Sequence, residues 1–337
     1  MSKKPYLLLF LYLLTGITGC SLPSGFVFLT GGALGTTYAI TFKKPSGSAP
    51  HFVQQVEKTI AGSFEQINNS LSIYNYHSLI SGINNNTSQE TDSLFRTVFN
   101  KAVEIAACTD GAFDISAAPF FDLWGFGLEK KASVTPQTLE EIRQFTGMDK
   151  FLLEGTKLLK KDPRSSLSMN AIAKGFACDF IANELQALGI TDLLVEIGGE
   201  VMCRGLNPHK QPWKIGIDSP VDGNVHPGKD IYVTLRLTDK GLATSGNYRN
   251  YYEENGEKFA HIINPKTGTP VNHNLLSATV VAEDCMTADA YATAFMVMGL
   301  EATIAFLKDH PELGAYLIYG QEQTFRTYAT DNILIDL

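Results

Sequence analysis

A helical run near residue 290 carries a carboxylate and a hydroxyl at helical spacing. In Cys285-Met-Thr-Ala-Asp289-Ala-Tyr-Ala-Thr293-Ala-Phe, Asp289 and Thr293 stand four residues apart and therefore share one face of a helix. The alanines around them leave room for a ligand. Mg²⁺ takes few protein oxygens and completes its shell with phosphate and water, so the pair suits this ion. A helix cap or a buried polar pair is the alternative interpretation.

A histidine stands where a predicted strand meets a turn rich in Pro and Gly, in His261-Ile-Ile-Asn-Pro265-Lys-Thr-Gly268. Histidine is the usual proton acceptor near neutral pH. A structural histidine at a strand end is the alternative. The sequence holds no G-x-S-x-G motif, so a serine-hydrolase triad has no nucleophile.

Two further segments could approach an anion. The run Ser168-Met-Asn-Ala-Ile-Ala-Lys174-Gly175 opens a predicted helix that continues to Leu188, with Lys174 off its apolar stripe. A helix N-terminus attracts anions, although periodicity alone predicts that Lys174 is simply solvated. In Val195-Glu-Ile-Gly-Gly-Glu200 the two glycines would let backbone amides approach a ligand, but the G-x-G-x-x-G and Walker patterns are missing.

The elements that must position these residues are helices at both ends of the chain and strands between them. The predicted helices cover 51–69, 92–107, 136–146, 285–298 and 301–310, and the predicted strands cover 36–42, 193–197, 213–218, 231–237 and 258–263. Asn255-Gly256 indicates a hairpin between 248–252 and the last of these strands. This order favours one α+β domain with mixed or antiparallel sheets packed by helices.

Composition narrows the class of protein. The 337 residues are 44% hydrophobic and 18% charged, as in a globular protein, and the net charge of −8 argues against a general nucleic-acid binder. Cys108, Cys178, Cys203 and Cys285 form no C-x-x-C pair and lie in apolar surroundings, which favours buried free thiols, with a disulfide left open.

The N-terminus has the pattern of a secretory signal. Lys3 and Lys4 precede an apolar run too short to span a membrane, and Ile17-Thr-Gly-Cys20 is similar to a bacterial lipobox. We predict a signal peptide over 1–19, lipidation of Cys20, a tether over 20–32 and a catalytic domain over 33–337. An ordinary signal peptide is the alternative. The lipid would hold the chain in the cell envelope, facing the periplasm, and Ser21 favours the outer membrane over the inner one by resemblance to sorting rules.

The order of the motifs resembles the ApbE family of FAD:protein FMN transferases. The resemblance spans roughly residues 33 to 300. It rests on Gly35-Thr-Thr-Tyr38, Ser72-Ile-Tyr74, Gly111-Ala-Phe-Asp114, Trp124-Gly-Phe126, Ala171-Ile-Ala-Lys174, Glu196-Ile-Gly-Gly-Glu200, Ala243-Thr-Ser-Gly246, His261-Ile-Ile and Ala288-Asp289-Ala-Tyr-Ala-Thr293. It implies that FAD is bound as a substrate and split with Mg²⁺. FMN then passes to a Thr or Ser hydroxyl of an acceptor protein and AMP is released.

The resemblance also implies roles for single residues. Asp289 and Thr293 would bind Mg²⁺ through side chains, Ala171 would bind it through its backbone carbonyl, and His261 would deprotonate the acceptor hydroxyl. The residues implied to contact FAD are Leu34, Tyr74, Ala112, Phe113, Asp114, Ser168, Lys174 and Ile263. Acceptors in such a family include subunits of ion-pumping quinone reductases and other redox proteins outside the cytoplasmic membrane.

Three positions depart from the family pattern. Leu34 replaces the usual methionine, Ser168 replaces an aspartate, and Asn264-Pro265 replaces Asp-Pro. None of these removes an implied metal ligand, although Ser168 carries no charge with which to hold the nucleotide. Three other functions remain open: an FAD pyrophosphatase that gives FMN and AMP, a non-catalytic FAD-binding lipoprotein, and a transporter's substrate-binding protein, although no repeated halves are visible.

Overall fold

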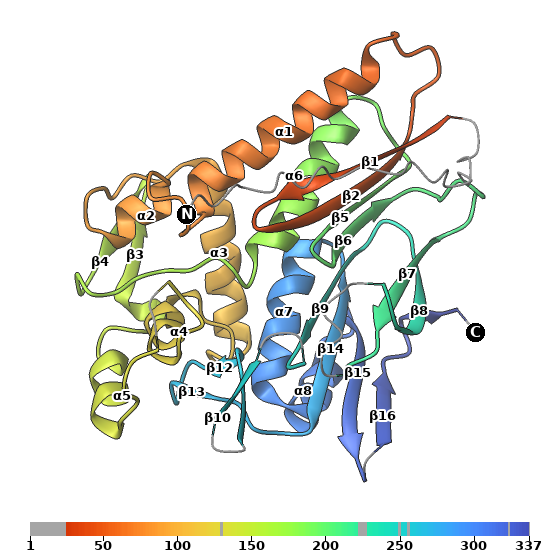
Figure 1. Cartoon of the computed structure of the whole chain (residues 1–337). Helices are drawn as coiled ribbons and strands as arrows, with labels where there is room; N and C mark the ends of the chain where they lie inside the picture. Colours follow the sequence, from red (N-terminus) through yellow and green to blue (C-terminus); the bar gives the residue numbers. More distant parts are fainter. Residues whose placement is uncertain are drawn as a thin grey trace, which may run out of the picture.

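A computed structural model describes residues 25–128, 131–221, 228–248, 251–254, 257–322 and 324–336. Its centre is an eight-stranded sheet in the order β1-β2-β5-β6-β9-β14-β15-β16, in which every neighbouring pair is antiparallel (Figure 1). The strands are β1 (Phe26–Ala33), β2 (Thr36–Lys43), β5 (Leu193–Ile197), β6 (Glu200–Arg204), β9 (Gly241–Gly246), β14 (Leu275–Ala282), β15 (Gly314–Gln321) and β16 (Thr324–Ala329).

Helices cover one face of this sheet and build the main core there. They include α1 (Phe52–Leu71), α3 (Ser93–Cys108), α6 (Ala173–Ala187), α7 (Cys285–Met298) and α8 (Leu300–Asp309) (Figure 1). α6 packs on β5 and β6, while α7 packs on β9 and β14. Because α6 and α7 also pack on each other, residues at their N-terminal ends come together above the middle of the sheet.

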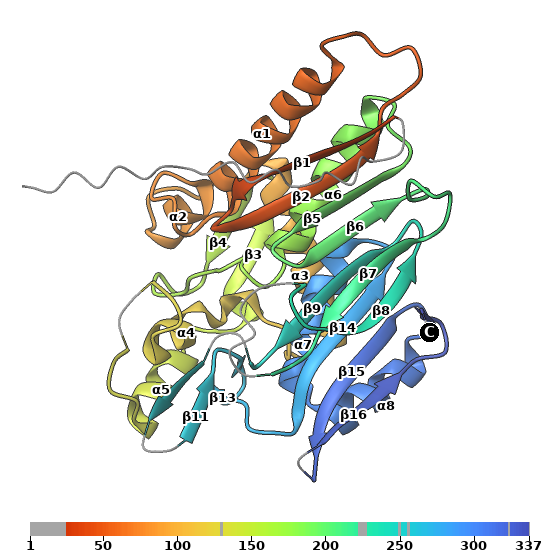
Figure 2. The same ribbon diagram turned by 45° about the vertical axis from the view of Figure 1, so that its right-hand side comes forward.

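A small sheet covers the other face. It consists of β17 (Leu334–Ile335), β8 (Ile231–Leu237) and β7 (Trp213–Asp218), in that order (Figure 2). Trp213, Ile215 and Leu235 pack there against Val201 and Leu242 of the large sheet, which forms a second core. The middle of the large sheet is therefore buried on both sides, and the predicted α+β architecture with antiparallel sheets and packed helices is confirmed.

The remaining elements surround one end of the main core. They are α2 (Leu79–Asn84), a 3₁₀ turn (Ile115–Ala117), α4 (Ala118–Trp124), α5 (Pro136–Arg143), a second 3₁₀ turn (Met148–Lys150), β3 (Phe151–Glu154), β4 (Lys157–Lys160), β10 (Tyr251–Glu254), β11 (Glu257–Ala260), β12 (Ile263–Asn264) and β13 (Thr269–Pro270). Phe120, Leu123, Trp124 and Ile263 form a third, smaller core between α4 and β12.

Three sequence expectations change. β1 pairs with β2 from Phe26 onward, so the folded domain extends into the range 20–32 that was predicted as tether. The predicted strand 258–263 is two strands, because β11 ends at Ala260 and β12 begins a separate pairing with β13 at Ile263. All four cysteines from Cys108 onward are free thiols, and three of them are buried, but Cys108, the last residue of α3, is exposed.

Cys20 and the predicted signal peptide lie outside the described residues. Within the described ranges, no helix combines the length and the apolar character that crossing a bilayer requires.

Candidate active site at the start of α6 and α7

The first turns of α6 and α7 touch without a side chain between them. A Cβ atom on Gly175 would lie 2.3 Å from the carbonyl oxygen of Cys285 and 2.8 Å from the Cβ of Asp289. Only glycine fits such an approach. The Lys174-Gly175 pair therefore has a packing reason, since the glycine lets α7 come close enough for its carboxylate to reach α6.

Asp289 lies at this contact and is almost fully buried. One of its carboxylate oxygens accepts a hydrogen bond of 3.0 Å from the amide of Gly175. Burial raises the pKa of Asp289, and the nearby ammonium of Lys174 opposes this effect. Thr293 follows one turn later, and its hydroxyl lies 3.3 Å from the hydroxyl of Ser245 on β9. Asp289 and Thr293 thus share the helix face that their spacing predicts.

Lys174 forms an ion pair with Glu200, the first residue of β6. Only 4% of Glu200 is exposed, and its second carboxylate oxygen is buried without a hydrogen-bond partner in the described part of the chain. Burial raises the pKa of Glu200 to about 7, against the attraction of Lys174. For Lys174, burial favours the neutral amine, but the carboxylates of Glu200 and Asp289 outweigh it and raise its pKa.

Lys174 is therefore not the solvated lysine that periodicity indicated. Only about one third of its side chain is exposed, and its ammonium is paired with the Glu200 carboxylate. The two carboxylates and the ammonium form a charged group on three different elements, α6, α7 and β6. Such a group can hold a divalent cation and a phosphate side by side.

A cavity of about 680 Å³ opens next to this group. Its wall includes Leu34 and Gly35 from the β1–β2 turn, Tyr74 from the loop after α1, and Asn170 and Lys174 from the start of α6. Leu34 has a left-handed backbone with φ of 52°. The ring of Tyr74 is 67% exposed, and its hydroxyl accepts a hydrogen bond of 3.2 Å from the Asn170 amide. Three of the predicted FAD contacts, Leu34, Tyr74 and Lys174, therefore line one cavity.

Asp114 and Ser168 belong to a second part of the site. Asp114 caps the 3₁₀ turn at Ile115 by accepting from the Ser116 amide at 2.7 Å, and burial raises its pKa. The amide of Ser168 donates to the carbonyl of Ile115 at 2.8 Å, which joins the two predicted segments. Ala112 and Phe113 are buried. Since the ring of Phe113 belongs to the main core, only its backbone is available to a nucleotide.

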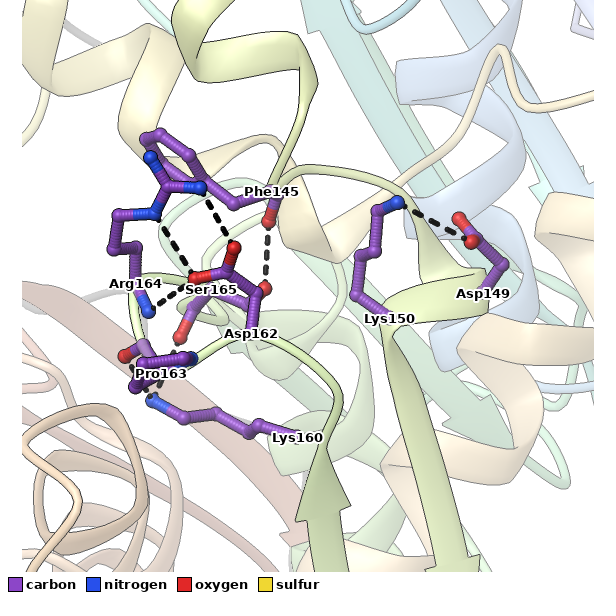
Figure 3. A network of polar contacts seen from close by, with 8 residues as sticks. All are labelled: Phe145, Asp149, Lys150, Lys160, Asp162, Pro163, Arg164 and Ser165. Atoms are coloured by element: carbon purple, nitrogen blue, oxygen red, sulfur yellow. Dashed lines mark hydrogen bonds and ion pairs between the residues drawn. The ribbon is translucent and has the colours of Figure 1, made fainter.

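The loop that carries Ser168 and Ala171 is anchored from behind. The ammonium of Lys160 donates to three carbonyl oxygens, those of Asn84, Pro163 and Ser165, and burial lowers its pKa. Next to it, Arg164 forms a two-pronged ion pair with Asp162 (Figure 3). The Asn84 side chain also bonds both to the amide and to the carbonyl of Leu167. These contacts fix the backbone that leads to Ala171.

His261 precedes a turn that packs on α4. The ring of His261 lies edge to face with that of Phe126, with 6.4 Å between the ring centres. Trp124 donates to the carbonyl of Gly268 at 2.8 Å, and Lys266 pairs with Asp110. Ile263 is buried in the small core and is not among the residues that line the cavity beside Lys174. The turn therefore docks beside the segment 110–126 rather than at the α6–α7 contact.

The Gly198-Gly199 segment is not a free phosphate cradle. Both glycines have positive φ, 65° and 104°, as a tight β5–β6 hairpin requires. The amide of Gly199, however, already donates to the Glu196 carboxylate at 2.7 Å. The motif contributes instead through the side chain of Glu200, which sequence reasoning did not single out. A charged residue directly after a buried strand and two glycines is the signal that could have found it.

The donor set fits Mg²⁺ better than a metal held by protein alone. In the described ranges, no group of three or more His, Cys, Asp and Glu side chains could hold a metal ion. Gly175 occupies only one oxygen of the Asp289 carboxylate, and the unpartnered oxygen of Glu200 marks the same buried region. A site with one carboxylate, one hydroxyl and one carbonyl is incomplete without phosphate or water, which is the set that Mg²⁺ prefers.

Comparison with known proteins places the chain in a family. A family model described as "ApbE family" matches residues 34–317. The chain belongs to the ApbE family. Two curated ApbE relatives, from Vibrio cholerae and Haemophilus influenzae, are both named FAD:protein FMN transferase. The first is 36% identical over 94% of each chain, and the second is 34% identical over 92% of this chain and 91% of the relative.

Solved ApbE structures share the fold. The flavin transferase ApbE from Vibrio cholerae has a TM-score of 0.81 at 34% identity, covering 91% of this chain and 97% of that one. The apo flavinyl transferase ApbE of Pseudomonas stutzeri has a TM-score of 0.81 at 28% identity, with 91% and 95% coverage. The large sheet and the helices on it therefore form the ApbE domain.

Proposed function

We propose that this ApbE-family chain transfers FMN from FAD to a Thr or Ser hydroxyl of an acceptor protein and releases AMP, with Mg²⁺ as cofactor. The relatives' shared name supports the transfer to a protein. The observation that carries the proposal is that Lys174, at the wall of the cavity, is held by the buried carboxylate of Glu200 and lies in the field of the buried Asp289.

The chain's own residues would divide the work. Tyr74, exposed at the cavity wall, offers an aromatic face on which the flavin or the adenine can stack. The ammonium of Lys174, which lines the cavity, would contact the phosphates. Asp289, Thr293 and the carbonyl of Ala171 would hold Mg²⁺. When bound, this ion neutralises charge on the pyrophosphate as its P–O bond breaks.

His261 is the proposed base. It would accept the proton of the acceptor hydroxyl, whose oxygen then bonds to the phosphorus of the FMN part while AMP leaves with the former bridging oxygen. The Phe126 ring and the docked turn after Ile263 would hold the imidazole in place. A water molecule in place of the hydroxyl would give FMN and AMP, which is the pyrophosphatase alternative.

We also propose that Cys20 is lipidated and that the mature chain faces the periplasm. The support is the Lys3-Lys4 start, the short apolar run and Ile17-Thr-Gly-Cys20. Its acceptors would then be redox proteins of the envelope, with subunits of ion-pumping quinone reductases as candidates. Mass spectrometry of the membrane fraction tests the anchor: an unmodified Cys20 in the mature chain would contradict it.

One assay separates the proposed reactions. The mature chain is incubated with FAD, Mg²⁺ and a candidate acceptor, and AMP release and acceptor mass are followed together. Transfer predicts AMP and an FMN adduct in equal amounts. AMP without an adduct, for every acceptor tried, would support hydrolysis. FAD that binds and stays intact under all conditions would support a non-catalytic flavin-binding protein.

A further inference from the structure

α6 and α7 are joined by hydrogen bonds near their N-terminal ends, because a carboxylate of each helix accepts from backbone amides of the other. Asp179 of α6 accepts from the first two amides of α7, those of Cys285 and Met286, with both distances 2.8 Å. In return, Asp289 of α7 accepts from the Gly175 amide of α6 at 3.0 Å. Each helix thus satisfies free amides of the other, and one of the carboxylates involved, that of Asp289, is a proposed Mg²⁺ ligand.

Asp179 caps α7 from a different helix. The cap that α7 carries itself, Asp284, accepts from the Thr287 amide at 2.7 Å and leaves the amides of Cys285 and Met286 to Asp179. Asp179 is 92% buried, and burying a carboxylate costs free energy even when it is hydrogen-bonded. A Cβ on Gly241 would lie 2.3 Å from the amide nitrogen of Cys285, so β9 closes the other side of the same turn. The first turn of α7 is therefore fixed from α6, from β9 and from its own cap.

The proposed ligands lie on two segments that these hydrogen bonds join. Ala171 is on the loop that enters α6, whereas Asp289 is in the second turn of α7. Nothing in the sequence between them fixes this separation, because the two segments are more than a hundred residues apart. Asp179 is one of the two carboxylates that bond the helix ends to each other, and Asp289 is the other.

We propose that Asp179 is a positioning residue of the metal site: by bonding the first turn of α7 to α6, it holds the Asp289 carboxylate at the distance from the Ala171 carbonyl that Mg²⁺ requires. The inference rests on the proposed Mg²⁺ site. Residues that orient ligands from behind typically change metal affinity by about 10–100-fold when they are replaced.

Mn²⁺ binding to the full mature chain tests the inference without turnover. Free Mn²⁺ is measured by electron paramagnetic resonance in the unsubstituted protein, in Asp179→Asn and in Asp284→Asn. The second variant is a matched control, because it removes the negative charge of the aspartate that caps the same helix and leaves the residues of α6 unchanged. We expect Asp179→Asn to raise the Mn²⁺ dissociation constant at least about tenfold, and Asp284→Asn to change it less than about twofold while lowering the melting temperature.

Two results would overturn the positioning role: an unchanged Mn²⁺ affinity in Asp179→Asn, or an equal loss in both variants, which would mean that any weakening of α7 is enough. Failure of the proposed metal site looks different. In that case the unsubstituted protein binds no Mn²⁺, or Asp289→Ala does not abolish the binding, and the inference falls with the site.

Hydrogen exchange of the unsubstituted protein gives a test that survives a variant that does not fold. If Asp179 couples the helix ends to the metal, then adding Mn²⁺ slows exchange of the Cys285 and Met286 amides by linkage. The Phe95 amide, which Asp92 caps at the start of α3, should not change. Unchanged exchange at Cys285 and Met286 with Mn²⁺ bound would refute the coupling.

Discussion

The ammonium of Lys174 forms an ion pair with the buried carboxylate of Glu200, and the carboxylate of Asp289 is the second anion that raises the pKa of this lysine. When all three groups are ionised, one net negative charge remains in a site that is largely shielded from water. A divalent cation changes this to one net positive charge, which a phosphate can then neutralise, whereas a phosphate alone would increase the negative charge. The charges therefore favour binding of the metal together with the substrate's phosphates.

Replacing both partners of the Lys174–Glu200 ion pair should destabilise the fold by less than the sum of the two single replacements. We expect Lys174→Met to cost about 2 kcal/mol, because it leaves Glu200 buried and unpaired, with the partial exposure of Lys174 reducing the usual cost. The double variant with Glu200→Gln should be more stable than the sum of the single effects by about 1 kcal/mol. Urea unfolding of all four proteins measures this coupling. If the two single effects simply add in the double variant, the ion pair contributes no coupling energy to the stability of the fold.

Asp289→Ala should reduce the rate of turnover far more than it reduces the affinity for FAD. The metal acts chiefly on charge that develops as the pyrophosphate breaks, so we expect AMP release to fall at least about 100-fold while FAD affinity changes by a few-fold. Glu283→Gln is the control, since Glu283 is an exposed acid just before the same helix. Normal AMP release in Asp289→Ala would refute the metal assignment.

His261→Ala should slow transfer and leave the fold intact. Loss of a general base typically costs about 10²–10⁴ in rate, whereas FAD binding, which does not need the base, should not change. His209, an exposed histidine, provides the matched alanine variant. If His261→Ala unfolds the protein by circular dichroism, the histidine has a structural role against Phe126 instead.

Tyr74→Ala should weaken FAD binding, because the ring stands exposed at the cavity wall. Loss of one stacking partner costs about 1–3 kcal/mol, and quenching of flavin fluorescence measures it. Tyr74→Phe keeps the ring and loses only the bond from Asn170, so its effect should be small. Tyr76→Ala removes a neighbouring ring that is 78% exposed and does not line the cavity. Equal losses at positions 74 and 76 would contradict stacking at Tyr74.

Stability should fall as the pH rises from about 4 to about 7. Burial raises the pKa of Asp179 from 3.8 to about 7, so in this window the native state keeps a proton that the unfolded state has lost. Stability from this group is complete below pH 4 and is lost as the pH rises through 7, by at most about 4 kcal/mol. Urea unfolding at several pH values measures this loss. The free energy of unfolding should fall less steeply with pH in Asp179→Asn than in the unsubstituted protein. An equal slope in both proteins would mean that Asp179 is ionised throughout.

Local patterns predict an element well where its caps and composition mark it within the segment. The helix 285–298 was placed correctly, because its caps and small residues act within the segment itself. β1 was missed because Phe26–Ala33 contains Gly31 and Gly32, and only pairing with β2 identifies it as a strand. A pairing partner is a tertiary fact that a single segment does not carry.

The site was predictable in its residue types and not in its contacts. Spacing brought Asp289 and Thr293 to one face, and resemblance singled out Lys174. The partner of Lys174 could not be found this way, since Glu200 is brought to it only by the packing of α6 on β6. The same holds for Asp179, whose targets are amides of Cys285 and Met286 that sequence does not distinguish from any other amides.

The position of β1 in the chain limits the distance between Cys20 and the cavity. It begins at Phe26, six residues after Cys20, and it ends at Ala33, directly before the turn that lines the cavity. Six residues span at most about 21 Å, and an eight-residue strand covers about 26 Å. With a lipid on Cys20, the catalytic cavity would thus work within about 50 Å of the bilayer surface. Only acceptors whose hydroxyl lies within this distance of the bilayer would be modified. The distance between the acceptor hydroxyl and the membrane would thus contribute to the choice of partner.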